Sequence, residues 1–153
     1  MKKITTLFII MILSVVTLAA CSKEQTKTYE GDINGKQVIT TLTYKGDDLL
    51  KQSTIGTVKY DDLGIDEQKA KKLFAKNEKA FKNLKGADYN VDYKKNKAVE
   101  HIDVDFKEAN IKELKKRLGY VSPSDDDSKI SFEKMEKQLK RSGLTEKSNM
   151  NEN

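Results

Sequence analysis

The residues with the clearest capacity for chemistry occupy alternate positions in two short runs, 88–92 and 101–105. They are carboxylates, one amide and the only histidine of the chain: Asp88, Asn90, Asp92, His101, Asp103 and Asp105. Alternation by two places side chains on one face of a strand, so a hairpin would gather these six on one surface. Because oxygen ligands and one imidazole suit a divalent cation, this surface is a candidate metal or ligand site.

The alternative is an ordinary solvated sheet face. A loop at Lys95-Asn96 sets Asp88 opposite Asp103 and Asn90 opposite His101, and like charges directly across a strand pair are destabilising. A bound cation would relieve that repulsion, and so would strand twist and pairing with nearby lysines. We expect the solvated face and keep the metal or cationic-ligand site as a hypothesis.

No catalytic or cofactor motif accompanies these residues. The chain has no G-x-G-x-x-G, no G-x-x-x-x-G-K-[ST] and no G-x-S-x-G sequence. Asp125-Asp126-Asp127 lacks the alternation and the trailing glutamate of a calcium loop. We therefore predict no catalytic residues, no cofactor and no enzymatic activity.

Cys21, the only cysteine, is explained by the residues before it. Met1-Lys2-Lys3 precedes an apolar run, Ile4 to Ala20, that is interrupted only by Thr and Ser. This order is typical of a secretory signal peptide, and Leu18-Ala19-Ala20-Cys21 resembles the lipobox of bacterial lipoproteins. We expect cleavage between Ala20 and Cys21. Acyl chains such as palmitate on Cys21 would then anchor the protein, since two chains hold stably in a bilayer.

The anchor defines the expected location and domain organisation. The sequence predicts a signal peptide at 1–20, a lipidated cysteine and polar tether at 21–27, one domain at 28–144 and a disordered polar tail at 145–153. The domain would lie on the extracytoplasmic side of the cell membrane, and the lysine-rich, tryptophan-free composition leans toward a Gram-positive envelope. The mature net charge of about +3 is not concentrated in a stripe with stacking aromatics, so no nucleic-acid partner is expected.

Two hairpins would carry the strands. Asn34-Gly35 is the preferred pair for a two-residue turn, and it sets Gly31 opposite Val38. In the third strand, near Leu49 to Tyr60, Ile55 and Val58 cannot share a face, which predicts a β-bulge at Gly56. In the second hairpin Tyr93 faces Ala98, and Glu100 falls on the core side, where we expect it to snorkel or to lie at an edge.

Helices complete the domain. A long helix is predicted from Asp66, as its cap, to Leu84, with Gly86 closing its end. Short helices are expected at Asn110 to Leu118 and after a cap at Ser131. The fold class is α+β: an antiparallel sheet of about five strands in two hairpin or meander units, with the long helix and two short C-terminal helices packed on one face.

Four segments resemble the YehR-like lipoproteins of bacteria: the lipobox, "YEGDINGKQVITTLTYKGDDLLKQST", "KGADYNVDYKKNKAVEHIDVDFKEANIKELKKRLG" and "ISFEKMEKQLKRSGL". The resemblance implies an extracytoplasmic, lipid-anchored α+β domain and brings no reaction or catalytic residues with it. We therefore predict a non-enzymatic binding or interaction domain at the cell envelope. Its partners would be membrane lipid, through acylated Cys21, and an envelope protein or small ligand. The alternative is a small-ligand- or metal-binding lipoprotein that uses the acidic sheet face around His101.

Overall fold

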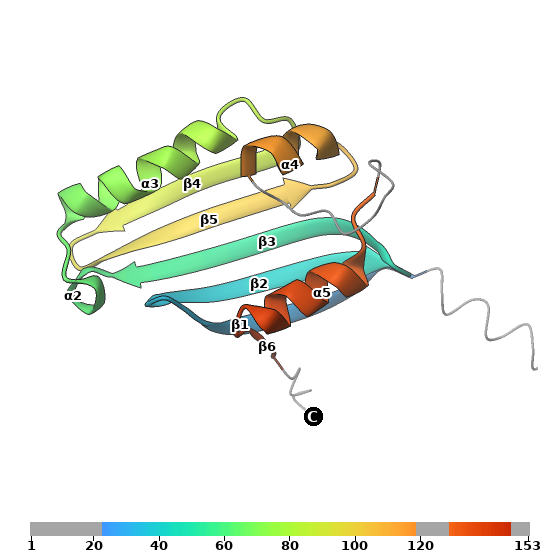
Figure 1. Ribbon diagram of the computed structural model, residues 1–153, viewed down its shortest axis with the longest axis horizontal. Helices are drawn as coiled ribbons and strands as arrows, with labels where there is room; N and C mark the ends of the chain where they lie inside the picture. The colour runs from blue at the N-terminus through green and yellow to red at the C-terminus, as the bar shows by residue number, and fades with distance from the viewer. Residues whose placement is uncertain (1–22, 119–128, 148–153) are drawn as a thin grey trace, which may run out of the picture.

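The structure is a computed structural model that describes residues 23–118 and 129–147 (Figure 1). The elements are β1 (Gln25–Ile33), β2 (Lys36–Lys45), β3 (Asp48–Lys59), α2 (Tyr60–Leu63), α3 (Glu67–Phe81), β4 (Ala87–Lys94), β5 (Lys97–Asp105), α4 (Ile111–Leu118), α5 (Phe132–Arg141) and β6 (Thr145–Glu146). The predicted signal peptide, Cys21 and Asp125 to Asp127 lie outside the described residues. Within the described ranges no helix has the length and apolar character needed to cross a membrane.

One antiparallel sheet of six strands forms the centre of the described domain, in the order β4-β5-β3-β2-β1-β6. Two hairpin units meet where β3 pairs with β5. Gly31 lies opposite Val38 and Tyr93 opposite Ala98, which confirms both predicted registers. The first turn has positive φ at Asn34 and Gly35, as its two-residue length requires.

The predicted β-bulge at Gly56 is wrong, and β3 is irregular nearer its start instead. Gly56 sits in a regular ladder opposite Val38, and the register shifts instead between Thr43 and Tyr44. No change of phase is needed at Gly56, because Ile55 is exposed on one face of the sheet while Val58 is buried on the other. The displaced bulge instead lets the consecutive residues Leu49 and Leu50 both be buried.

In the described part of the chain α3, α4 and α5 lie on one side of the sheet, with α3 and α4 near β4 and β5 and with α5 near β1 and β2 (Figure 1). Asp66 caps α3 as predicted, since its Oδ1 accepts from the Lys69 backbone N–H at 2.7 Å. The helix ends at Phe81, before the predicted Leu84. Ser131 caps α5 as predicted, accepting from the Lys134 N–H at 3.3 Å.

Both boundaries of the domain extend beyond the prediction. β1 begins at Gln25, so the last three residues of the predicted tether belong to the sheet. At the other end Thr145 and Glu146, predicted to start a disordered tail, form β6 against Glu30 and Tyr29. A two-residue strand carries no alternation, so its sequence contains no signal that could distinguish it from a tail.

The core divides into two apolar clusters. The larger includes Tyr29, Leu42, Phe81 and Val104 and lies under α5 and the end of α3. The smaller lies under the start of α3 and consists of Val58, Tyr60, Ala70, Phe74 and Ala98. Glu100 of β5 and Asn77 of α3 are polar residues that lie between the two clusters, and their contacts are described below.

Candidate functional site

The side of the sheet away from the helices is left uncovered by the described residues and is called here the open face. Ile39 of β2 and Ile55 of β3 lie directly opposite each other on it, and they are 41% and 40% exposed. His101 of β5 follows next to Ile55 in the same row. Two large apolar side chains and an imidazole thus form a short strip across the three middle strands.

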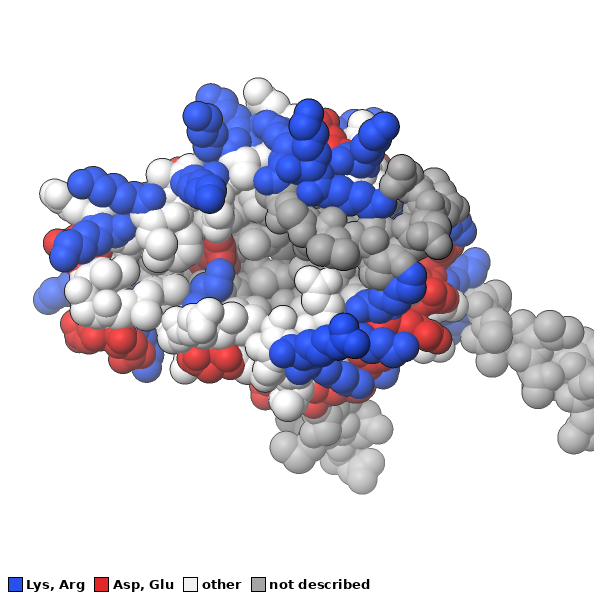
Figure 2. All heavy atoms as spheres, in the orientation of Figure 1, with Lys and Arg blue, Asp and Glu red and all other residues white. Residues whose placement is uncertain are grey.

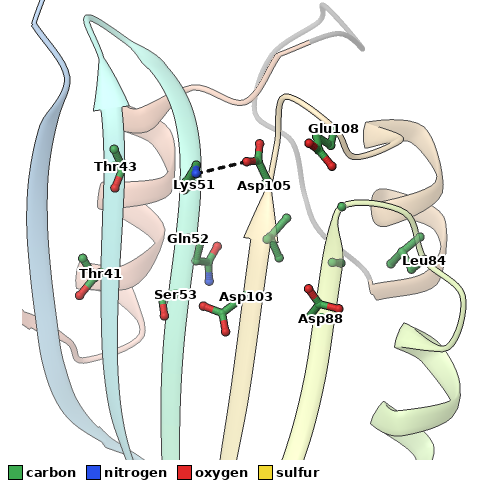
Figure 3. A pocket seen from close by; sticks show the side chains of 13 residues that line it. Thr41, Thr43, Lys51, Gln52, Ser53, Leu84, Asp88, Asp103, Asp105 and Glu108 are labelled. Atoms are coloured by element: carbon green, nitrogen blue, oxygen red, sulfur yellow. Dashed lines mark ion pairs between the residues drawn. The ribbon is translucent and has the colours of Figure 1, made fainter.

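One end of the open face is hollowed (Figure 3). The hollow has a volume of about 470 Å³ and combines hydroxyl groups with carboxylates. Thr41, Thr43 and Ser53 line it from β2 and β3, and Asp88 and Asp103 from β4 and β5. The chemistry of this lining suits a polar ligand that carries hydroxyl or ammonium groups.

The predicted site residues lie on the open face in the predicted register. Asp88 is opposite Asp103 and Asn90 is opposite His101. The structure nevertheless distributes them in two places: three carboxylates, Asp88, Asp103 and Asp105, line the hollow, while His101 contacts Asp92, with His101 Nε2 3.5 Å from Asp92 Oδ2.

Lysine neighbours follow the expected arrangement of a solvated face. Lys51 Nζ lies 3.4 Å from Asp105 Oδ2, across the β3–β5 pair. Among the described residues, no three His, Cys, Asp or Glu side chains come close enough together to hold a metal ion. The register prediction is confirmed, and the geometry gives the metal hypothesis no support.

A second polar region lies on the opposite, helix-covered side of the sheet, centred on Glu100. Glu100 is only 1% exposed. Its carboxylate accepts from Lys36 Nζ at 2.5 Å, from the Tyr89 hydroxyl at 2.7 Å and from Asn77 Nδ2 at 3.1 Å. The predicted snorkelling or edge position is therefore wrong, because β5 lies inside the sheet and the charge is satisfied within the core.

The position of this cluster follows from the two apolar clusters. Along β5 Glu100 falls between Ala98 of the smaller cluster and Ile102, which packs against the larger. On α3 Asn77 falls likewise between Phe74 and Phe81. Room for the ion pair comes from the glycine at position 56, opposite Glu100 in β3: a Cβ there would lie 3.1 Å from Glu100 Oε2.

Glu100 is stabilised as a carboxylate by the three donors around it. Burial acts to raise its pKa, but the hydrogen bonds from Lys36, Tyr89 and Asn77 outweigh burial and hold the pKa below its ordinary value. The pKa of Tyr89 is raised, first by burial and then by donation to this carboxylate. A carboxylate that already accepts three donors is poorly placed to act as a base, so Glu100 serves the fold.

The sequence contains a signal for the Glu100–Asn77 contact that the register of the second hairpin does not provide by itself. Glu100 takes a core position of a strand, and Asn77 takes a core position of the helix expected to cover it. Two polar residues at core positions of facing elements predict a contact between them, because buried polar groups need partners. The contribution of Lys36 could not be predicted in this way, since it depends on the β3–β5 pairing that joins the two hairpin units.

A second carboxylate cluster, only partly buried, ties α5 to the sheet. Glu136 Oε1 accepts from the Tyr29 hydroxyl at 2.7 Å and contacts Lys27 Nζ at 3.3 Å and Lys140 Nζ at 2.9 Å. The hydrogen bond from Tyr29 is the main reason that the pKa of Glu136 falls to about 2.

Comparisons with known proteins identify relatives over almost the whole length. A family model described as "Protein of unknown function (DUF1307)" matches residues 25–145. The uncharacterized lipoprotein Lin0239 of Listeria innocua is 35% identical over 95% of this chain and 96% of its own. The uncharacterized lipoprotein YehR of Escherichia coli is 32% identical over 95% of this chain and 99% of its own.

Solved structures agree with the architecture. The NMR structure of E. coli YehR superimposes with a TM-score of 0.69 at 25% identity, covering 86% of this chain and 99% of that one. An NMR structure of a protein from Streptococcus pneumoniae TIGR4 gives a TM-score of 0.53 at 19% identity, which shows a similar fold.

Proposed function

The chain belongs to the DUF1307 family and is similar to bacterial lipoproteins, and from this premise we propose a binding function without catalysis. In this proposal the domain is anchored through acylated Cys21 at the extracytoplasmic face of the cell membrane. It binds an envelope protein through the open face of the sheet. The lean of the composition toward a Gram-positive envelope stays a prediction.

The open apolar strip is the observation that supports this proposal most directly. A sheet whose helices all lie on one side must expose its other side, and that side normally carries polar residues. Here the middle of the exposed side instead carries Ile39 and Ile55, directly opposite each other and both about two-fifths exposed. Apolar pairs bordered by polar side chains are typical of protein interaction surfaces.

The polar clusters of the described residues support binding over catalysis. Glu100 and Glu136 each accept from a tyrosine and at least one further donor, so both carboxylates are engaged in holding elements together. His101 lies beside Asp92 on the open face of the sheet and is not one of the residues that line the hollow. General acid–base chemistry needs a group whose proton a substrate can reach in a shaped site.

Affinity capture tests the proposal. The mature chain, residues 21–153, is used as bait on envelope extract and compared with Ile39→Lys/Ile55→Lys. A matched control is Leu63→Lys/Leu73→Lys, which places the same two new charges at exposed leucines of α2 and α3, outside the apolar strip. We expect a protein that the wild type and the control enrich equally and that the double variant loses. Equal capture by all three chains would contradict the proposal.

The hollow beside the strip favours a second candidate, a small polar ligand. Its hydroxyl and carboxylate lining includes Asp88, Asp103 and Asp105, three of the six residues that the sequence singled out. A thermal-shift screen with calcium, zinc, manganese and polyhydroxylated amines tests this candidate. A rise in melting temperature that Asp103→Asn removes and His101→Ala keeps would assign the ligand to the hollow; no shift with any compound would reject it.

A further inference from the structure

A basic patch forms where the end of α3 meets α4. Segments 82–85 and 111–118 contain six cations and a single carboxylate, Glu113: the cations are Lys82, Lys85, Lys112, Lys115, Lys116 and Arg117. Arg117 Nη2 donates to the Lys82 carbonyl oxygen at 3.1 Å, which joins the two segments. Figure 2 shows basic side chains gathered over this part of the molecule.

The patch concentrates the charge of the whole mature chain. Six cations against one carboxylate give these two segments a net charge of +5, whereas the mature chain carries about +3, because Lys2 and Lys3 leave with the signal peptide. The remainder of the mature chain is therefore slightly acidic. In the linear sequence the two segments lie apart, so the concentration becomes visible only in the fold.

The helix α4 presents this charge outward. Its apolar side chains Ile111 and Leu114 are buried against the domain. Lys112, Lys116 and Arg117 are exposed, and together they line an open hollow of about 520 Å³.

A short segment joins the expected anchor to the domain. Only Ser22, Lys23 and Glu24 separate Cys21 from β1, so the chain from Cys21 to Gln25 spans at most ~14 Å when fully extended. Glu24 Oε1 lies 3.2 Å from Lys107 Nζ, in the turn between β5 and α4. The chain thus enters the domain near the start of α4.

We propose that the basic patch lies on the anionic lipid headgroups of the membrane that holds Cys21. The inference deepens the proposed function, since it rests on the lipid anchor. Juxtamembrane cations are attracted to anionic headgroups over roughly one Debye length, ~8–10 Å at ordinary salt, and the short tether keeps the domain near that range. In this orientation the side of the sheet with α4 faces the lipid, and the open face stays accessible to a partner.

The first experiment tests the orientation. The mature chain is coupled through the thiol of Cys21, its only cysteine, to a maleimide lipid in vesicles. The vesicles contain phosphatidylcholine alone or with phosphatidylglycerol, and lysine acetylation is read by mass spectrometry. We expect acetylation of Lys112 and Lys116 to fall ~3-fold or more on the anionic vesicles, while Lys69 and Lys72, exposed at the other end of α3, keep their reactivity. Unchanged reactivity of Lys112 and Lys116 would overturn the proposal.

The second experiment tests the attraction without the anchor. Partition of the uncoupled mature chain onto the anionic vesicles should fall ~10-fold or more in Lys112→Glu/Lys116→Glu. The matched variant Lys69→Glu/Lys72→Glu carries the same change in net charge and should stay within ~2-fold of the wild type. Equal losses in both variants would overturn the proposal, because net charge and not the patch would then drive the contact. Chemical coupling supplies the anchor in the first experiment and the second experiment uses none, so neither result depends on lipidation in cells or on a partner of the open face.

Discussion

Glu100 and Glu136 perform similar chemistry in two regions of the molecule, with the roles of sheet and helix reversed. At Glu100 the sheet supplies the carboxylate and α3 supplies a donor, Asn77. At Glu136 the helix α5 supplies the carboxylate and the sheet supplies the donor, Tyr29. Each cluster fixes a helix on the same face of the sheet, one on each hairpin unit.

Burial separates the two clusters. The side chain of Glu100 is 1% exposed, and burial is the largest single influence on its pKa, opposing ionisation. Glu136 is 17% exposed, and its largest influence is the hydrogen bond from Tyr29, which favours ionisation. Ion pairs in a core gain little net stability but are costly to break, whereas partly solvated pairs lose less when one partner is removed. The four predictions below test this difference.

Removal of the Glu100 carboxylate should have the largest effect. Glu100→Leu leaves the Tyr89 hydroxyl, the Asn77 amide and Lys36 without their shared acceptor, and it should lower the free energy of unfolding by about 3–5 kcal/mol, measured by urea denaturation. Glu100→Gln keeps one acceptor oxygen and should lose less. The variant Lys36→Met/Tyr89→Phe/Glu100→Leu should recover much of the loss; if it is as unstable as Glu100→Leu, orphaned partners are not the cause.

Replacement of two glycines compares a position beside the Glu100 cluster with a position beside the segment that leads into β6. Gly56→Ala places a Cβ 3.1 Å from Glu100 Oε2 and 3.1 Å from Lys36 Cδ, and should cost about 1–3 kcal/mol by crowding the ion pair. Gly31→Ala meets the Gly143 carbonyl oxygen at 2.8 Å and should displace the segment that leads into β6. Hydrogen exchange should therefore rise at residues 143–147 in Gly31→Ala and not in Gly56→Ala. Exchange that rises there in both variants would contradict the assignment.

Glu136→Gln should have a smaller, pH-dependent effect of about 1–2 kcal/mol at neutral pH, since the hydrogen bond from Tyr29 becomes neutral and the partly solvated ion pairs with Lys27 and Lys140 lose their anion. The pKa of Glu136 is about 2 in the folded chain, against an ordinary value of 4.5. A lowered folded pKa stabilises above the ordinary value and stops contributing as pH falls through the folded one. The stability gap between wild type and Glu136→Gln should therefore shrink from pH 4.5 to pH 2. A gap that does not change over this range would contradict the lowered pKa.

An exposed ion pair of nearly the same geometry should show the smallest effect. Lys71 Nζ lies 2.6 Å from Glu67 Oε1 on α3, but both side chains are about half exposed. Lys71→Gln should cost at most about 0.5 kcal/mol by thermal or urea denaturation. A cost close to that of Glu100→Leu would show that distance, and not burial, decides the strength of these pairs.

Much of the fold was accessible from the sequence because local rules determine it. Asn34-Gly35 fixes the register of the first hairpin, and Asp66 and Ser131 fix the starts of α3 and α5. The prediction failed where structure depends on contacts distant in sequence. Gly56 was taken for a bulge, yet it is the space that an ion pair between β2 and β5 requires.

For the candidate site, too, the sequence predicted local strand register but not the contacts between distant strands. Alternation placed Asp88, Asp103 and His101 on one face in the right register. It did not show that the carboxylates line a hollow with hydroxyls from β2 and β3, because this requires the β3–β5 pairing. The apolar strip was not predicted for a different reason: Ile39 and Ile55 come from the adjacent strands β2 and β3, and the prediction assigned no pairing between their exposed faces.

The strand β6 matters most when many copies share one membrane. Lipid anchoring confines chains to two dimensions and raises their effective concentration, so an unpaired strand edge becomes a template for a neighbour. Thr145 and Glu146 pair with Glu30 and Tyr29, and the Lys147 N–H donates to the Thr28 carbonyl oxygen, which occupies part of the β1 edge within the chain. At the other edge of the sheet β4 has no such cover among the described residues. Lateral association of anchored copies should therefore start at β4. Removal of β6 would expose the edge of β1 as a second contact, so that dimers could extend into linear oligomers.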